Sequence, residues 1–186
     1  MKKISLAFVL ILSLVIAGNA SATCTFTTYG PYVWAWIEWY VYDMSQDCYT
    51  LSSNVSSQNG SCNYGPGWSF GGGWSETATA SFTIDSSVPV IDPTKWTVSS
   101  FIEAYSPSAD WYDQIEIDVI VHHPNNTNSY YQPFYWNGTM TTLNGCQQQY
   151  GFFSADTGDV VTIQIKTTNL TGATLKATVP GIQNSN

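Results

Sequence analysis

Residues 32–43 read YVWAWIEWYVYD, an apolar and aromatic run with one carboxylate, Glu38, near its centre and Asp43 at its end. The residues alternate with a period of two, which predicts a β-strand over residues 32–42 rather than a helix. One predicted face is purely apolar and suits a protein core. The other face places five aromatic rings around the acid: Tyr32, Trp34, Trp36, Tyr40 and Tyr42.

Similar alternating stretches, separated by turn residues, recur along the chain, and no helical periodicity follows residue 22. This pattern is typical of all-β proteins. We predict a two-sheet β-sandwich or jelly roll of about eight or nine antiparallel strands, stapled by disulfides. The predicted strands are residues 25–28, 32–42, 76–84, 96–105, 114–122, 130–136, 138–143, 160–168 and 174–179.

The N-terminal segment has the features of a secretory signal peptide. Lys2 and Lys3 precede an apolar run, and the small residues Ala-Ser-Ala end at position 22. We therefore predict a signal peptide over residues 1–22 and a secreted product, extracellular or at the cell surface. No later segment is apolar over the roughly 20 residues that cross a bilayer. Residues 23–186 should form one domain, with a long loop rich in Gly, Ser and Asn at residues 44–75.

The charge of the chain limits its partners. After the signal peptide the sequence has three lysines and no arginine against thirteen Asp and Glu, a net charge of −10. So few cations cannot neutralise phosphate groups, which excludes nucleic acid and anionic membranes as expected partners. A neutral glycan, or another component of the extracellular surface, is the predicted partner, and no cofactor is predicted.

Four cysteines follow the predicted signal peptide, and in an exported chain disulfides are favoured over free thiols. Three pairings can be drawn. We favour Cys48 with Cys62, which closes the long loop, and Cys24 with Cys146, which ties the first strand to a later one. Five sequons predict N-glycosylation where the host performs it: Asn54, Asn59, Asn125, Asn137 and Asn169.

The aromatic content suggests a binding surface. Rings exposed along a β-face stack on the apolar faces of sugars, and neighbouring polar side chains bond the hydroxyls. The predicted ligand-binding residues are the five rings of the first strand, together with two rings of the long loop: Tyr32, Trp34, Trp36, Tyr40, Tyr42, Trp68 and Trp74. The alternative is that these rings pack, with the long loop covering them.

Glu38 is the first candidate for chemistry, because a carboxyl group among rings would be partly desolvated and could act as a general acid. The run AWIEWY resembles a strand of the eqolisin-type glutamic peptidases, and IEWYVYD is similar to the nucleophile strand of family 11 xylanases. The xylanase resemblance implies a second acid, which FIEAYSPS supplies as Glu103. Each resemblance covers one strand. The order of elements departs from both families, so neither is assigned.

DQIEIDVIVHH is the second candidate for chemistry, because Glu116, Asp118 and His122 alternate on one face of a predicted strand. The Glu-x-Asp spacing is similar to the family 16 glycosidase signature, although Ile120 replaces its third acid. The three side chains could instead bind a divalent metal, or form a solvated outer face.

Three functions therefore remain open. A protein that binds neutral carbohydrate through an exposed aromatic strand face is the leading hypothesis. The first alternative is a structural subunit of a cell-surface layer or filament, in which self-association covers that face. The second alternative is an acid-tolerant secreted glycosidase or glutamic-type peptidase that uses Glu38.

Overall fold

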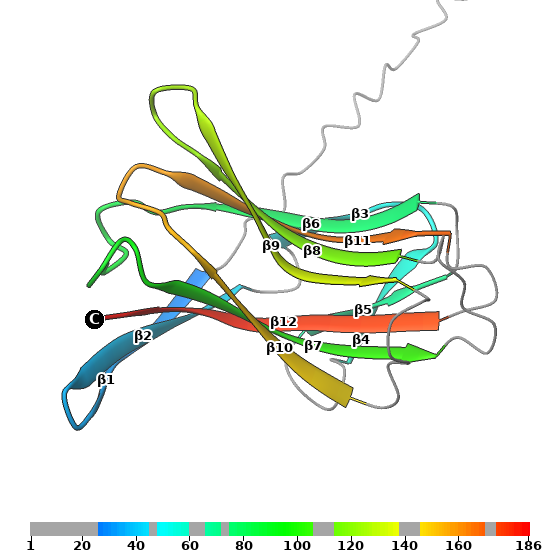
Figure 1. Cartoon of the computed structure of the whole chain (residues 1–186), viewed down its shortest axis with the longest axis horizontal. Coiled ribbons are helices and arrows are strands. Elements are labelled where there is room, and N and C mark those ends of the chain that lie inside the picture. The colour runs from blue at the N-terminus through cyan, green and yellow to red at the C-terminus, as the bar shows by residue number, and fades with distance from the viewer. Residues whose placement is uncertain are drawn as a thin grey trace, which may run out of the picture.

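The computed structural model describes residues 26–44, 48–59, 66–71, 75–105, 114–137, 146–169 and 174–186, which form two antiparallel β-sheets packed face to face (Figure 1). The first sheet, sheet A, has seven strands: β1 (Phe26–Trp34), β2 (Ile37–Met44), β4 (Val55–Asn59), β5 (Pro66–Phe70), β7 (Trp96–Tyr105), β10 (Cys146–Phe153) and β12 (Thr174–Ser185). The second, sheet B, has five: β3 (Tyr49–Leu51), β6 (Ser75–Thr83), β8 (Gln114–His122), β9 (Asn128–Asn137) and β11 (Val160–Thr168). The predicted all-β sandwich is confirmed, with about twelve strands in place of eight or nine.

Strand β12 lies in the middle of sheet A and pairs with three other strands. Along one edge it pairs with β7, which in turn pairs with β10. Its other edge is shared end to end: residues 175–178 pair with β5, and residues 182–185 pair with β2. A bulge lies between these two parts of β12, at Val179 and Pro180. Proline cannot donate to a ladder and is found at such bulges.

The strands of sheet B account for the clearest pattern in the sequence, the alternation of apolar and polar residues. Strands β8 and β11 alternate strictly between buried and partly exposed residues, because one face packs on sheet A and the other faces solvent. The strand order is β3-β6-β11-β8-β9. Predicted strands 76–84, 96–105, 114–122, 130–136 and 160–168 all coincide with observed strands.

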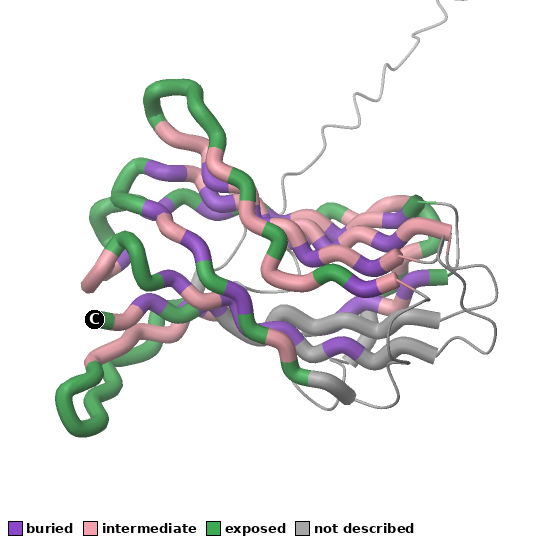
Figure 2. Tube along the Cα trace, in the orientation of Figure 1, coloured by how far each residue is buried: buried purple, intermediate pink, exposed green. Residues whose placement is uncertain are grey.

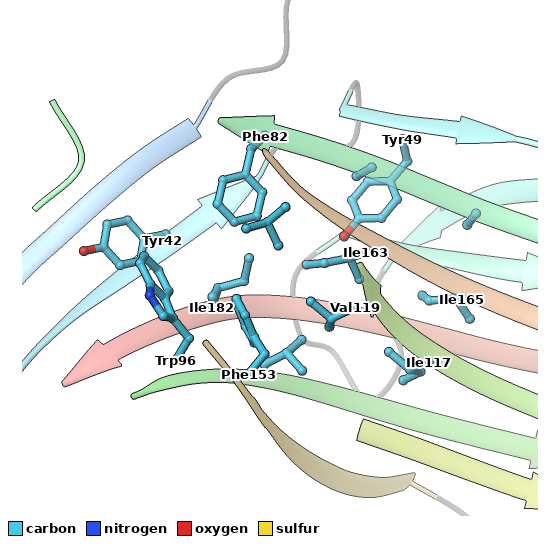
Figure 3. Packing of buried hydrophobic residues seen from close by; sticks show 14 of the residues in the cluster. Tyr42, Tyr49, Phe82, Trp96, Ile117, Val119, Phe153, Ile163, Ile165 and Ile182 are labelled. Atoms are coloured by element: carbon cyan, nitrogen blue, oxygen red, sulfur yellow. The ribbon is translucent and has the colours of Figure 1, made fainter. Parts of the chain in front are cut away.

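The core lies between the sheets (Figure 3). Trp96 stacks on Phe153 with ring centroids 5.8 Å apart, contacts Tyr42 at 5.3 Å, and donates from Nε1 to the backbone oxygen of Ala155 at 2.8 Å. Tyr42 donates its hydroxyl to the backbone oxygen of Pro89. At the other end of the core, Tyr49 packs on Trp68 with centroids 4.0 Å apart. Burial raises the pKa of both tyrosines, so neither phenol ionises in the folded protein.

The two sheets also meet at their edge strands β9 and β10. A bulge in β9 lies at Gln132 and Pro133. Gly151 of β10 faces it so closely that a Cβ on Gly151 would lie 1.9 Å from the Cβ of Pro133. Only glycine fits this crossing.

Several predictions need correction. Residues 32–42 are not one strand: β1 ends at Trp34, Ala35 and Trp36 form a turn, and β2 returns antiparallel from Ile37. The predicted long loop at 44–75 contains strands β3, β4 and β5, which are only three to five residues long. Strand β10 was missed because three glutamines follow Cys146 at its start and hide its alternation. The predicted strand at 138–143 lies outside the described residues.

Cys48 is disulfide-bonded. The side chains of Cys24, Cys62 and Cys146 lie outside the described residues, so both favoured pairings stay predictions. Within the described part of the chain, no helix is long and apolar enough to cross a membrane.

Candidate functional site

The β1–β2 hairpin projects from one end of the sandwich, and its tip is exposed on all sides (Figures 1 and 2). The register pairs Trp34 with Ile37 and Tyr32 with Trp39. Directly paired residues share a face, so these four side chains lie together. The rings of Tyr32 and Trp39 confirm it, with centroids 5.8 Å apart. Trp34 is 73% exposed, and Trp36, at the turn, is 84% exposed.

The same face continues across sheet A as its solvent side. Pairing in register places Tyr29, Val41, Gln183, Thr97 and Phe152 in one row across strands β1, β2, β12, β7 and β10. Four interstrand spacings separate the ends of this row, roughly 19 Å. Phe152 is 73% exposed, and Tyr150 lies beside it two residues along β10. We name this surface the outer aromatic face; its rings are Tyr29, Tyr32, Trp34, Trp39, Tyr150 and Phe152.

Polar groups lie between the two sets of rings. Gln183 is exposed and Thr97 partly exposed in the middle of the row. Asp43, two residues beyond Val41 on the same face, is half-buried, and desolvation raises the pKa of its carboxyl group. A desolvated carboxylate bonds hydroxyl donors strongly. The outer aromatic face thus combines apolar walls with amide, hydroxyl and carboxyl groups.

Backbone contacts fix the position of the hairpin. Asn186 accepts at Oδ1 from the backbone nitrogen of Glu38 at 3.1 Å, donates its own backbone nitrogen to the Glu38 oxygen at 3.1 Å, and donates Nδ2 to the Trp36 oxygen at 3.0 Å. At the bulge of β1, Gly30 has φ of 124°, and a Cβ there would lie 3.0 Å from the backbone oxygen of Trp39. The turn and bulge therefore hold the rings outward.

The structure divides the predicted ligand-binding residues into three groups. Tyr32 and Trp34 lie on the outer aromatic face, and Trp36 lies at the hairpin tip. Tyr42 and Trp68 are fully buried in the core and cannot contact a ligand, and Tyr40 is partly buried against that core, so these predictions were wrong. Tyr40 and Tyr42 point inward because β2 reverses the chain and turns its even-numbered residues toward sheet B, whereas Trp68 lies on strand β5 and not in a loop. Trp74 lies outside the described residues.

The predicted acid pair does not come together. Glu38 lies on β2 beside Asn186, whereas Glu103 on β7 pairs in register with Lys176 at the other end of β12. About nine residues of strand separate them, on the order of 30 Å. A glycosidase needs its two carboxyl groups within about 10 Å. The paired use of Glu38 and Glu103 is therefore excluded.

Glu116, Asp118 and His122 lie along the solvent side of β8, as predicted. Lys166 bonds Glu116 at 3.0 Å, and Nδ1 of His122 lies 3.0 Å from Oδ1 of Asn128. Desolvation, with the neighbouring charge of Glu116, raises the pKa of Asp118. Among the residues that the structure describes, no three His, Cys, Asp or Glu groups come close enough to hold a metal ion.

The sequons occupy varied positions. Asn54, Asn125 and Asn169 lie in turns or at strand ends, and Asn54 and Asn169 have positive φ. Asn59 and Asn137 are the last residues of β4 and β9. Their glycosylation stays a prediction.

Sequence reasoning missed Tyr29, Trp39, Tyr150 and Phe152. Trp39 was assigned to the core because a single strand was assumed; in a hairpin its face turns outward. A turn at Ala35 had no glycine, proline or asparagine to signal it, although Ala35 adopts φ of 57°. Nothing in the local sequence of β10 brings its rings next to β1, since three strands lie between them.

No protein-family model matches the chain, and no curated protein matches it. Among solved structures, the chain is similar to one described as a carbohydrate-binding module of the β-sandwich superfamily, with 10% identity and a TM-score of 0.49 over 90% of this chain and 87% of that one. It is also similar to a second module of carbohydrate-binding family 16, with 11% identity, a TM-score of 0.45, and 69% and 84% coverage. A third is the CBM22-1 xylan-binding domain of Xyn10C from Paenibacillus barcinonensis, with 14% identity, a TM-score of 0.48, and 75% and 86% coverage. Likeness at this level assigns no function.

Proposed function

We propose that this chain is a secreted protein that binds a neutral carbohydrate through the outer aromatic face. The observation that supports this most is the arrangement of six rings at the two ends of a row whose middle is polar. Apolar walls with a few polar groups between them are typical of small-molecule sites. The row is long enough for an extended oligosaccharide to contact both sets of rings.

The chemistry of this surface fits sugars better than other ligands. Indole and phenol rings offer flat apolar area to the C–H face of a sugar ring, while Gln183, Thr97 and Asp43 can bond its hydroxyl groups. None of the residues named in the outer aromatic face is cationic. A net charge of −10 after the predicted signal peptide would repel anionic polysaccharides and anionic lipids alike.

The exposed rings leave apolar surface in contact with water, which is unfavourable in free energy, and a ligand that covers them would remove this contact. Large apolar side chains are normally buried, and burying one fully stabilises a protein by about 1.5–3 kcal/mol. Contiguous exposed apolar patches mark interaction sites in soluble proteins. Covering Trp34 and Phe152 with a sugar chain would bury area that the described residues leave open to solvent.

The test is retention of the purified protein on insoluble cellulose, xylan, mannan and chitin. Trp34→Ala and Phe152→Ala should each weaken binding to the retained polysaccharide by about tenfold or more, because buried aromatic contacts dominate such interfaces. Tyr130→Ala is the matched control: Tyr130 is 71% exposed, but lies on β9 of sheet B. The control should bind as the wild type does.

Three outcomes would overturn the proposal. Equal loss in the Tyr130→Ala control would show a nonspecific effect of removing surface rings. Unchanged retention in both test variants would remove the outer aromatic face from the interaction. Failure to bind any polysaccharide, together with concentration-dependent self-association in sedimentation, would favour the structural-subunit hypothesis.

A further inference from the structure

An open cavity of about 630 Å³ lies at the same end of the sandwich as the β1–β2 hairpin, but is built by other elements. Its walls come from the segment before β7, from the β8–β9 hairpin, and from the turn between β10 and β11. The lining residues used below are Pro93, His123, Pro124, Asn125, Ser129, Tyr131, Ala155, Asp156 and Asp159. None of them belongs to the outer aromatic face.

A linear hydrogen-bond relay runs along this cavity. Oδ1 of Asp159 lies 2.9 Å from Nδ1 of His123, and Nε2 of the same ring lies 2.9 Å from Oγ of Ser129. Both His123 nitrogens are thus engaged, one by an acid and one by a hydroxyl. With the proton on Nδ1 facing the carboxylate, Nε2 is the acceptor for the serine hydroxyl.

The relay is rigidly held. Asp159 is buried, and its second oxygen, Oδ2, accepts from the backbone nitrogen of Asp156 at 2.8 Å. The backbone of Asp159 is also fixed, because its oxygen accepts from Ile84 at 2.9 Å. His123 donates its backbone nitrogen to the Thr127 oxygen at 2.9 Å and accepts at its own oxygen from Asn126 at 3.0 Å. The imidazole therefore has one orientation, with its Nε2 edge toward Ser129.

We propose that Ser129, His123 and Asp159 form a nucleophilic site that hydrolyses a carboxylic ester. The order acid, imidazole and hydroxyl, with the acid on Nδ1 and the hydroxyl on Nε2, is the geometry of a serine hydrolase triad, which is recognised by roles rather than by position in the sequence. Ser129 and His123 are the catalytic residues, and Asp159 positions His123.

The reaction balances with water as the second reactant. Oγ of Ser129 attacks the ester carbonyl carbon while Nε2 of His123 takes the hydroxyl proton. The tetrahedral intermediate expels the alcohol, which receives that proton, and an acyl-serine remains. Water then attacks the acyl-serine with His123 as base, and the carboxylic acid leaves as Ser129 regains its proton.

Two side chains can stabilise the negative oxygen of the intermediate. Tyr131 and Asn125 both line the cavity, and no hydrogen bond of the Tyr131 hydroxyl or of Asn125 Nδ2 is found among the described residues. Tyr131 lies two residues after Ser129, on the same face of β9. Donors aimed at this oxygen contribute about 10²- to 10³-fold to the rate in hydrolases.

The cavity also selects the substrate class. Pro93, Pro124 and Ala155 offer apolar contacts to a short acyl group, whereas Asp156 and Asp159 supply only negative charge, and no lining residue is Lys or Arg. A carboxylate or phosphate on the substrate would be repelled. The expected substrate is a neutral ester of a short-chain acid.

The test uses 4-nitrophenyl acetate as substrate and a fluorophosphonate probe that reacts with activated serines. The serine oxygen displaces fluoride from phosphorus, and peptide mass spectrometry then locates the label. We expect hydrolysis above the buffer rate and a label on Ser129 of the wild-type protein. Ser129→Ala and His123→Gln should lose hydrolysis by about 10³-fold or more.

Controls separate catalysis from structure. Ser81 on β6 of the same sheet also has a side-chain partner, Thr162 at 2.8 Å, but does not line the cavity, so Ser81→Ala should hydrolyse as the wild type does. Asp159→Asn should lower kcat by at least about tenfold with little change in KM, which a purely structural role would not produce.

The label is read on the wild-type protein, so the result does not depend on whether a variant folds. A folded wild type that is neither labelled nor active would overturn the proposal, as would a label on another residue, or hydrolysis that survives in Ser129→Ala. Any of these three results would leave the relay as a structural link between the β8–β9 hairpin and the turn between β10 and β11. Polysaccharide retention should be unchanged in these variants, because none of the substituted residues belongs to the outer aromatic face, so the two proposals fail independently.

Discussion

The β1–β2 and β8–β9 hairpins leave the same end of the sandwich (Figure 1), but their side chains are engaged differently. Besides its backbone bonds, the β8–β9 hairpin is held by its own side chains: His123 bonds Asp159 and Ser129, and Asn125 accepts from the backbone nitrogen and hydroxyl of Thr127. The β1–β2 hairpin is fixed through its backbone, which Asn186 and β12 hold.

This difference decides what each hairpin can do. Where side chains are used to anchor a hairpin, they are oriented precisely and can support chemistry that needs fixed geometry. Where the backbone does the anchoring, the side chains stay free to contact a partner. The polar hairpin is thus suited to a reactive site, and the aromatic hairpin to a binding surface.

The largest expected effect on stability is that of Gly151→Ala, which disrupts the contact between β9 and β10. Gly151→Ala places a methyl group against Pro133 in the β9 bulge, where no space exists, so β9 and β10 must separate. We expect a loss of more than about 3 kcal/mol in the free energy of unfolding, measured by urea denaturation. Phe152→Ala, at the next residue, should change it by less than about 0.5 kcal/mol, because that ring is exposed. Equal effects would refute the close crossing.

The second prediction weakens the support of the aromatic hairpin. Asn184 is buried at the end of β12, accepts from the backbone nitrogens of Ile91 and Asp92, and donates to the oxygens of Asp92 and Lys95. Asn184→Leu leaves these groups without partners and should cost about 2 kcal/mol. Gln183→Ala, exposed and adjacent, serves as the control in the same denaturation series. A near-zero cost for Asn184→Leu would contradict the network.

The third prediction loosens the aromatic hairpin alone. Asn186→Ala removes two of its side-chain bonds, to the Glu38 nitrogen and the Trp36 oxygen. Both bonds are exposed, so we expect a loss of about 0.5–1 kcal/mol. Amide hydrogen exchange should quicken in residues 32–39 while the β8–β9 hairpin is unchanged. Faster exchange in both hairpins would show that their anchors are not separate.

The smallest effect concerns pH. Because the folded protein raises the pKa of Asp118, its ionised form destabilises the fold, and stability falls as pH rises through this pKa. Asp118→Asn should therefore be slightly more stable than the wild type at pH 7, and the difference should vanish below about pH 3.

Asp85→Asn is the control with the opposite sign. Hydrogen bonds from the side chain and backbone of Ser87 lower the pKa of Asp85. That carboxylate therefore adds stability above its ordinary pKa, and the Asn variant should be the less stable one at pH 7. Thermal unfolding from pH 3 to pH 7 checks both variants, and shifts of the same sign would contradict the assignment.

The sequence predicted strands β6, β8, β9 and β11 of sheet B and strand β7 of sheet A, but missed β4, β5 and β10 of sheet A, for a physical reason. Strands such as β8 and β11 have one face in the core and one in water, so burial alone produces their alternation. Strands β5 and β10 pair with β12 and β7, which are far away in the sequence, and the polar residues of β4 and β10 carry no periodic signal. The β1–β2 turn was hidden because Ala35 occupies a position that glycine or asparagine normally takes.

The candidate sites show the same limit. The aromatic character of residues 32–39 was clear from the sequence. Which rings face outward depends on the turn at Ala35 and Trp36, and no residue in this stretch is typical of a turn. His123 was assigned no role from the sequence, because its partners, Ser129 and Asp159, become neighbours only through the folded hairpin. The aromatic residue types suggested a ligand-binding surface, but the pairing register of the strands decides which of these side chains face solvent and can contact a ligand.

The bulge in β12 determines which face of the β1–β2 hairpin is turned to solvent. Strands β5 and β2 pair with the same edge of β12, on either side of residues 179–180. These two residues therefore determine which face of β2 lies on the same side of the sheet as a given face of β5. Side chains alternate with a period of two, so adding or deleting one residue there would leave the β5 half in register and turn the hairpin over. Tyr32 and Trp34 would then lie on the opposite face of the hairpin, and Val33 and Glu38 would lie on the side of the outer aromatic face. Which face the hairpin presents to solvent therefore depends on the number of residues in the bulge of β12.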